Sequence, residues 1–230
     1  METDGNSAMK VLNEHGVTLV ELMVALVITG IISAAMYSAY TGQQRINQSQ
    51  DQIVEMQQNL RAGLDMMVRE IRMAGYDPAD TGNFGFTAAG ANSMTFTMVN
   101  DEVGGVRTIS YEHSVGYGDT DGIRDIRRRV DAGNFIVLIE NVEAVEFYYT
   151  LSDGTRTLTP SGNDLMTNSI RSVQISVLAR ASGVSLNYTN NQTYRPASIP
   201  DLNTPVWGPF NDNIRRRMQI VTVYCRNMGW

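Results

Sequence analysis

The hydrophobic pattern near the start of the chain has two parts. A segment that is apolar at nearly every position is followed by a segment with hydrophobic residues on one helical face only. No charged residue occurs between Glu21 and Arg45, and positions 22–40 are almost all apolar or small. As a helix that rises 1.5 Å per residue, this interval is roughly long enough to cross a bilayer core of ~30 Å. One carboxylate, Glu21, stands at the entrance of the apolar segment. A carboxylate is costly in hydrocarbon unless it finds a partner, so Glu21 is a candidate functional residue.

After Tyr40 the pattern becomes amphipathic. Hydrophobic residues recur at steps that place them on one helical face, with Gln, Asn, Arg, Asp and Glu between them. No proline occurs from Val17 to Asp77, and Gly75 followed by Pro78 is a typical helix stop. The pattern predicts one helix over 17–76, ~60 residues and roughly 90 Å long. The predicted buried face consists of Ile46, Ile53, Met56, Leu60, Leu64, Met67, Ile71 and Ala74.

The two halves of this helix suit different surroundings. The half at 17–40 suits a membrane or a fibre core made of identical helices, and the second half suits packing onto a globular domain. Gly30 and Gly42 are positions where the helix could bend or locally unwind.

Beyond Pro78 the pattern changes to short alternating runs separated by turn residues, which predicts β-strands. Ser152-Asp153-Gly154 predicts a hairpin turn. Segment 183–213 has no periodicity and is rich in Asn, Pro, Thr and Ser, so it is interpreted as a surface loop. The expected fold is α+β, with a long N-terminal helix packed on an antiparallel sheet in a domain over 77–230. The predicted strands cover 94–99, 106–111, 123–130, 135–139, 141–149, 156–158, 172–180 and 219–226.

Composition argues against several functional classes. The formal net charge of −6 is against nucleic acid as the main ligand. The single cysteine, Cys225, allows no intrachain disulfide, and its neighbours predict a packed thiol in a strand, with intermolecular pairing as the alternative. His15 and His113 are the only histidines, and no nucleophile, phosphate-loop or dinucleotide motif is present. We therefore expect no catalytic site, no metal centre built on histidine and no cofactor.

Two further features have a structural and a functional interpretation. Asp119 and Asp121 lie among glycines, as in some calcium loops, but a turn capped by the two carboxylates explains them as well. The triplets 127–129 and 215–217 are all arginine. On a strand the middle residue points away from its two neighbours. They are interpreted as solvated or acid-paired strand residues, with a partner-docking patch as the alternative.

The segment from Gly16 to Leu26 reads Gly-Val-Thr-Leu-Val-Glu-Leu-Met-Val-Ala-Leu. It resembles the cleavage and methylation motif of type IV pilins and of type II secretion pseudopilins. The resemblance implies a prepilin leader over 1–16, cut after Gly16 by a prepilin peptidase, and N-methylation of the new N-terminus, Val17. It also implies that Glu21 neutralises the N-terminus of a neighbouring subunit. Val17 departs from the phenylalanine that is usual at the first mature position.

Later segments resemble PilW-type minor pilins. These are the helix end from Leu60 to Pro78, the hairpin from Ile126 to Glu143 and the ending Tyr224-Cys225-Arg226-Asn227. Pseudopilins of the J kind have the same general layout. The resemblance implies a subunit that primes or caps a pilus, anchored in the inner membrane before assembly and then part of the surface fibre. Its implied partners are major and minor pilins, the prepilin peptidase, the inner-membrane assembly platform and, before assembly, membrane lipid.

The sequence leaves two alternatives open. A minor pseudopilin of a type II secretion system has the same subunit design. A secreted enzyme or binding protein would instead carry an ordinary signal peptide, cut after Ser33-Ala34-Ala35 and before Met36. Either Met1 or Met9 can be the true start of the chain.

Overall fold

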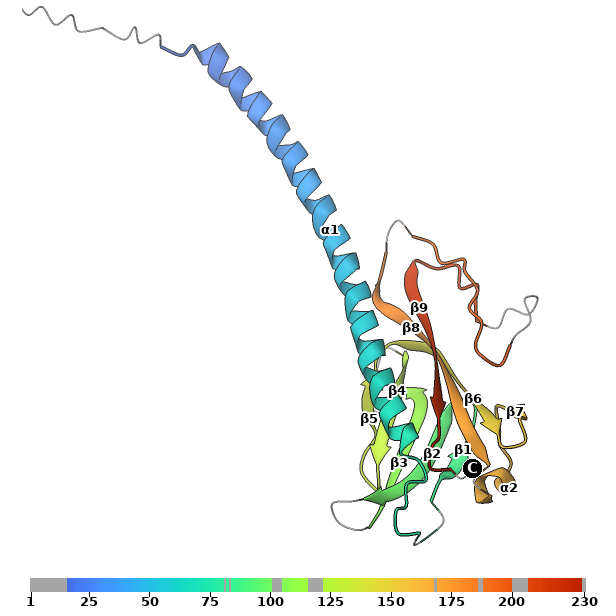
Figure 1. Ribbon diagram of the computed structural model, residues 1–230. Coiled ribbons are helices and arrows are strands. Elements are labelled where there is room, and N and C mark those ends of the chain that lie inside the picture. Colours follow the sequence, from blue (N-terminus) through green and yellow to red (C-terminus); the bar gives the residue numbers. More distant parts are fainter. Residues whose placement is uncertain are drawn as a thin grey trace, which may run out of the picture. The chain divides into compact units, whose positions relative to one another are not determined.

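The computed structural model describes residues 16–80, 82, 84–100, 105–115, 122–167, 169–185, 188–199 and 207–228. It confirms the predicted fold class, a long N-terminal helix with antiparallel β-structure (Figure 1). The chain divides into two compact units, Met1–Asn47 and Gln48–Trp230. The long helix runs through the boundary between them, so each unit contains part of it.

The helix α1 spans Leu19–Arg72, somewhat less than the predicted 17–76. Its last turn tightens, because Met73 N–H donates to Glu70 O at 2.9 Å rather than to a carbonyl one residue earlier. Gly75 then adopts a φ of +78°, the left-handed conformation that ends many helices, which confirms the predicted stop. The helix is continuous through Gly30 and Gly42, the two positions predicted to be weak points.

The β-structure forms two antiparallel sheets instead of the single sheet expected. Sheet A has the order β1-β2-β3-β4-β5 and sheet B has the order β7-β6-β8-β9. Pairing of β6 with β7 confirms the predicted hairpin, in which Gly154 has a φ of +85°. The strands are β1 (Phe86–Ala89), β2 (Ser93–Asn100), β3 (Gly105–Val115), β4 (Arg124–Val130), β5 (Ile136–Ile139), β6 (Val142–Leu151), β7 (Arg156–Thr157), β8 (Ile170–Val184) and β9 (Ile214–Tyr224).

Two short elements were missed by the sequence reasoning. Strand β1 has only four residues, and its sequence does not alternate between apolar and polar side chains. It is identified as a strand by its pairing with β2, which no local pattern predicts. Helix α2 (Gly162–Met166) begins with a capping box, in which Ser161 and Asp164 exchange hydrogen bonds between side chain and backbone. That Ser-x-x-Asp pattern was a local signal available in the sequence.

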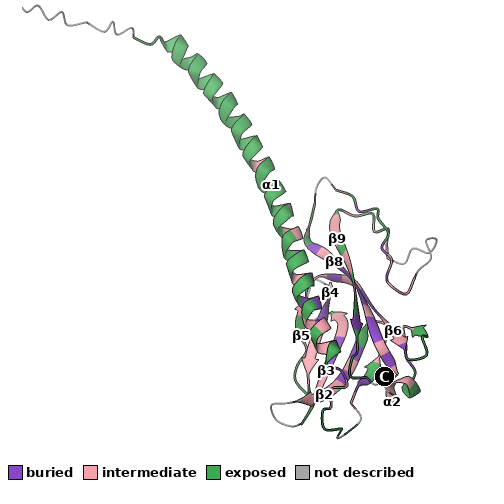
Figure 2. Ribbon diagram, viewed as in Figure 1, coloured by how far each residue is buried: buried purple, intermediate pink, exposed green. Residues whose placement is uncertain are grey.

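The core of the unit Gln48–Trp230 lies between the second half of α1 and the inner faces of both sheets (Figure 2). Five residues of the predicted buried face of α1, called the apolar stripe below, are buried there: Met56, Leu60, Leu64, Met67 and Ile71. The prediction was wrong at Ile46, which is 53% exposed and belongs to the unit Met1–Asn47. The thiol of Cys225 is packed in the core, as predicted, but Cys225 lies just after β9 and not within a strand. Burial raises the pKa of this thiol to about 12.

A polar cluster at the border of the core joins α1 to sheet A. Glu70 of α1 receives hydrogen bonds from Tyr111 and Arg128, which face each other across β3 and β4. The Nε of Arg128 lies 2.9 Å from Glu70 Oε2. Hydrogen bonding to Glu70 raises the pKa of Arg128, and burial raises the pKa of Tyr111. One carboxylate thus fixes the helix against two neighbouring strands.

The segment predicted as a surface loop is partly docked on sheet B. The flanking strands are longer than expected, since β8 continues to Val184 and β9 begins at Ile214. Between them, Tyr194 pairs with Trp207 and is buried. Ser198 donates to the buried carboxylate of Glu146 from both its backbone N–H and its hydroxyl, at 3.0 and 2.7 Å. The described parts of this segment, 188–199 and 207–213, are called the strap below.

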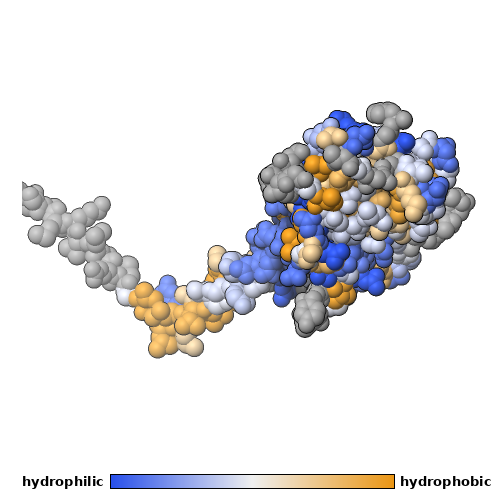
Figure 3. Space-filling view, turned by 90° about the horizontal axis from the view of Figure 1, so that it is seen from below, coloured by the Kyte–Doolittle hydropathy of each residue, from blue (hydrophilic) through white to orange (hydrophobic). Residues whose placement is uncertain are grey.

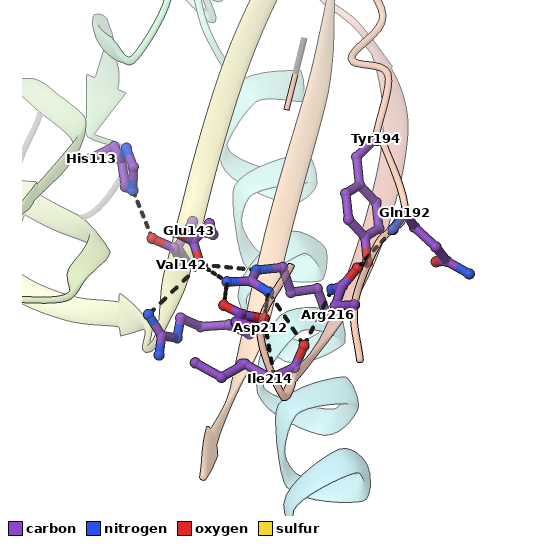
Figure 4. A network of polar contacts seen from close by, with 10 residues as sticks. His113, Val142, Glu143, Gln192, Tyr194, Asp212, Ile214 and Arg216 are labelled. Carbon is purple, nitrogen blue, oxygen red and sulfur yellow. Dashed lines mark hydrogen bonds and ion pairs between the residues drawn. The ribbon is translucent and has the colours of Figure 1, made fainter. Parts of the chain in front are cut away.

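Arg216 of β9 holds one end of the strap (Figure 4). Its guanidinium donates to Glu143 of β6 at 2.8 Å and to Asp212 of the strap at 2.7 Å, and it lies 3.8 Å from the ring centre of Phe210. The hydrogen bond from Arg216 lowers the pKa of Asp212. The side chain of Arg216 is only 2% exposed. The middle arginine of each triplet is therefore paired with acids, as the structural interpretation predicted.

Candidate functional site: the start of the long helix

The candidate site begins at the residues just before α1. Gly16, Val17 and Thr18 are exposed and precede the first helical residue, Leu19. The peptide bond between Gly16 and Val17 therefore lies outside the helix, in the kind of exposed backbone that a peptidase can engage.

Thr18 caps the helix. Its side-chain oxygen accepts from the backbone N–H of Glu21 at 3.3 Å, and its carbonyl accepts from Leu22 N–H at 3.1 Å. A threonine at this position satisfies one of the backbone donors that a helix start leaves free. The motif thus has a local structural role beside any role in processing.

Glu21 occupies the first turn of the helix. A carboxylate there interacts favourably with the positive end of the helix dipole, typically by about 0.3–1 kcal/mol at an exposed site. That gain is small compared with the cost of taking an unpaired carboxylate into hydrocarbon. The position therefore favours, without requiring, a cationic partner for Glu21.

The helix that follows is apolar and exposed around its whole circumference. Of its side chains, Leu22, Leu26 and Ile31 are 61%, 74% and 65% exposed. Figure 3 shows hydrophobic residues gathered along this part of α1. Its most apolar window has a mean hydropathy of 2.3 and no residue buried within the chain, so α1 is long and apolar enough to span a membrane. A surface of this kind needs an apolar environment from outside the chain.

The hydroxyl groups of two threonines within this segment are satisfied locally. Thr29 Oγ1 donates to Ala25 O at 2.8 Å, and Thr41 Oγ1 donates to Ser38 O at 3.0 Å. Such bonds to the preceding turn let a threonine enter hydrocarbon without an unpaired donor. The helix can thus lie in lipid or against other helices without leaving these groups unsatisfied.

The structure brings Gly16, Val17 and Glu21 together at one helix start, and their roles in processing and pairing stay predictions. The calcium candidates Asp119 and Asp121 lie outside the described residues. Within the described residues, no group of three or more His, Cys, Asp or Glu side chains could hold a metal ion.

Sequence reasoning missed the residues that fix α1 and the strap to the sheets. Glu70 and Arg128 are 58 residues apart, so no local pattern predicts their contact. One signal was available: Glu70 adjoins Ile71 and lies three residues after Met67, at the border of the apolar stripe. An acid at that border is a candidate for a buried partner.

Comparison with known proteins gives one match. Residues 12–37 match the family model of the prokaryotic N-terminal methylation motif. No curated protein and no solved structure matches the chain. The matched residues include Gly16, Val17 and Glu21 and the first apolar turns of α1. Together with the exposed apolar helix, the motif supports a membrane-anchored protein of the type IV pilin family, either a pilin or a pseudopilin.

Proposed function

We propose that this chain is a minor type IV pilin, a structural subunit and not an enzyme, which primes or caps assembly of a pilus. The observation that carries the proposal is the methylation motif at 12–37, placed at the start of a helix that is apolar on all sides. A cleavable leader joined to such a helix suits a subunit that is stored in a membrane and later extracted into a fibre.

In the proposed sequence of events, the apolar helix moves between two apolar environments, the lipid bilayer and the core of the fibre. The helix enters the inner membrane, and the prepilin peptidase cuts between Gly16 and Val17 and methylates the new N-terminus. The assembly platform then transfers the subunit to a growing fibre of major and minor pilins. Because the helix moves from lipid to a core of similar helices, extraction need not expose its apolar surface to water. In the fibre, Glu21 pairs with the cationic N-terminus of a neighbour.

The Glu21 pairing can be tested by substitution. Glu21→Ala removes the carboxylate and leaves the apolar surface intact, so the variant should insert into the membrane normally. It should fail to enter filaments, because an unpartnered buried N-terminal charge costs about 3–5 kcal/mol. Immunoblots of sheared filaments measure incorporation into the fibre, and immunoblots of membranes measure insertion.

Glu55→Ala is the matched control, since Glu55 is another exposed acid on α1. It should enter filaments as the unaltered chain does. Normal incorporation of Glu21→Ala would contradict the proposed ion pair, and equal loss in both variants would show a general effect of removing charge from the helix.

A minor subunit is favoured over a major one by the resemblance to PilW-type chains and by the size of the unit Gln48–Trp230. A minor pseudopilin of a type II secretion system is the second candidate, since the motif and the helix suit it equally. Deletion of the gene separates the two. Loss of surface pili, adhesion and twitching supports the pilin, whereas loss of protein export with normal pili supports the pseudopilin.

A further inference from the structure

The edges of the two sheets differ in length. Among the described strands, sheet A ends in β1 and β5, of four residues each, and one side of sheet B ends in β7, of two residues. The other side of sheet B ends in β9, which has eleven residues and pairs with β8 along its length. A long edge strand offers a row of backbone donors and acceptors to another strand, and proteins usually blunt it with charges, proline or bulges.

The first half of β9 is blunted in this way. Arg215 donates to Ser185 and lies 4.3 Å from the ring centre of Tyr188, and Arg216 is held by Glu143 and Asp212. The register of β8 and β9 is also irregular at this end, between Arg180 and Val184. Contacts with the strap and with neighbouring acids are therefore made at the Ile214–Arg216 end of β9.

The second half of β9, from Gln219 to Tyr224, has none of these devices. It reads Gln-Ile-Val-Thr-Val-Tyr, without a charge or a proline. On the face of sheet B opposite the core, Ile220 is 45% exposed, Tyr224 is 69% exposed, and Thr222 between them is exposed too. A run of β-branched and aromatic residues with no charge has a high tendency to pair with another strand.

We propose that this charge-free half of β9 pairs with the same segment of a second copy of the chain, antiparallel, about a two-fold axis at Thr222. Ile220 then faces Tyr224 of the second copy, Tyr224 faces Ile220, and the two Thr222 side chains meet. Aromatic with β-branched, and threonine with threonine, are favourable cross-strand pairs. The contact is self-complementary, as a two-fold interface requires.

Charge selects this register. Centring the pair on Arg216 would set the two arginine triplets against each other, which is unfavourable between like charges. Centring it on Ile220 would place Tyr224 opposite Arg216, whose guanidinium is already held by Glu143 and Asp212. With the axis at Thr222, the triplets lie outside the charge-free segment that pairs with itself. The pairing does not depend on filament assembly.

Each cross-strand pair contributes little by itself, so the dimer needs a high local concentration of chains. The test is therefore made on the full-length chain in its own membranes. Thr222→Cys places two thiols across the proposed axis, and mild oxidation with copper phenanthroline should give a dimer band on a non-reducing gel. The native Cys225 is buried, so the unaltered chain should give no such band.

Thr87→Cys is the matched control, because Thr87 is an exposed threonine on β1, an edge strand of sheet A. It should give no dimer band. A band of equal strength for Thr87→Cys and Thr222→Cys would overturn the proposal, since it would reflect random collision of chains held together in the membrane.

The register has its own test. Ile220→Cys and Tyr224→Cys should cross-link poorly when produced alone and well when produced together. Efficient cross-linking of Ile220→Cys alone would overturn the register.

A blocking substitution completes the design. In the Thr222→Cys background, Ile220→Lys should remove the dimer band, whereas Ile220→Val should keep it. Trypsin resistance of the monomer shows that each variant is folded. A folded Ile220→Lys variant with an unchanged band would contradict strand pairing.

Discussion

At the scale of single residues, the close approach of α1 to sheet A depends on Gly63. A Cβ at this position would lie 2.1 Å from Ile139 Cγ1 and 3.3 Å from Leu138 O. Glycine is the poorer helix former by about 1 kcal/mol relative to alanine, so propensity alone would favour alanine at this site. The steric overlap decides otherwise, because Ile139 is fully buried and the added Cβ would lie well inside contact distance of its side chain.

We predict that Gly63→Ala destabilises the folded chain. Overpacking of a core costs typically ~1–3 kcal/mol, which exceeds the propensity gain of about 1 kcal/mol in most cases. The free energy of unfolding can be measured by denaturant titration of the full chain in detergent micelles. Gly162→Ala is the control, since a Cβ there meets nothing within 4 Å. Unchanged or increased stability of Gly63→Ala would show that the helix and β5 are not in close contact.

Two buried tyrosines set the expected dependence of stability on alkaline pH. Burial is the first cause that raises the pKa of Tyr111 and of Tyr149 in the folded chain. The unfolded chain titrates these phenols near pH 10. Because the folded pKa is the higher one, the stabilisation is complete below about pH 10 and is lost as the pH rises further. Each buried phenol should contribute a loss of ~1.4 kcal/mol per pH unit in that range.

Tyr149→Phe should reduce this alkaline slope. The substitution removes one titrating phenol, and it also removes the hydrogen bond to Gly90 O at 3.0 Å, so stability at neutral pH should fall slightly. Unfolding titrations at pH 8 and pH 11 measure both effects. An unchanged slope would show that Tyr149 is ionised as readily in the folded chain as in the unfolded one.

At the scale of elements, two sets of polar contacts hold the strap to sheet B, one between Ser198 and Glu146 and the other centred on Arg216. Arg216→Ala removes the guanidinium that joins Asp212 of the strap to Glu143 of β6, so this end of the strap loses its ion pair to sheet B, while Glu143 keeps Arg180 at 3.7 Å. We predict faster amide hydrogen exchange in 188–199 and 207–213, with little change in β2 and β3. Arg217→Ala is the control, because Arg217 is an exposed neighbour on the same strand. Equal exchange in both variants would contradict this role of Arg216.

The helix and the strands could be predicted from the sequence where the pattern is local. The period of the stripe from Met56 to Ile71 and the glycine at 75 specify a helix, its buried face and its end. The division into two sheets has no such signal, because it depends on which strands pair across large separations, as β6 does with β8. Docking of the strap was missed for the same reason: Ser198 and Glu146 are 52 residues apart.

The candidate site is almost wholly a local feature, which is why the sequence predicts it. Gly16, Val17, Thr18 and Glu21 lie within a single helix start, and the charge-free run that follows is visible residue by residue. What the sequence alone did not reveal is the capping role of Thr18, which requires the distance to the N–H of Glu21.

At the scale of the whole molecule, the chain combines two units with different requirements. Met1–Asn47 carries an apolar helix that is exposed throughout its apolar segment among the described residues, and Gln48–Trp230 has its own core of helix and two sheets. The exposed apolar surface of the first unit calls for an apolar environment from outside the chain. We propose that lipid surrounds it before assembly and that neighbouring helices surround it afterwards.

Cleavage after Gly16 is the step on which the proposed function depends, because it releases the N-terminus that Glu21 would neutralise. Mass spectrometry of the N-terminal peptide of the protein purified from its own cells detects this cleavage. We predict a mature chain that begins at Val17 and carries one N-methyl group, and loss of this species when the prepilin peptidase is deleted. A mature chain that begins at Met36 would contradict the proposal and would indicate an ordinary secreted protein.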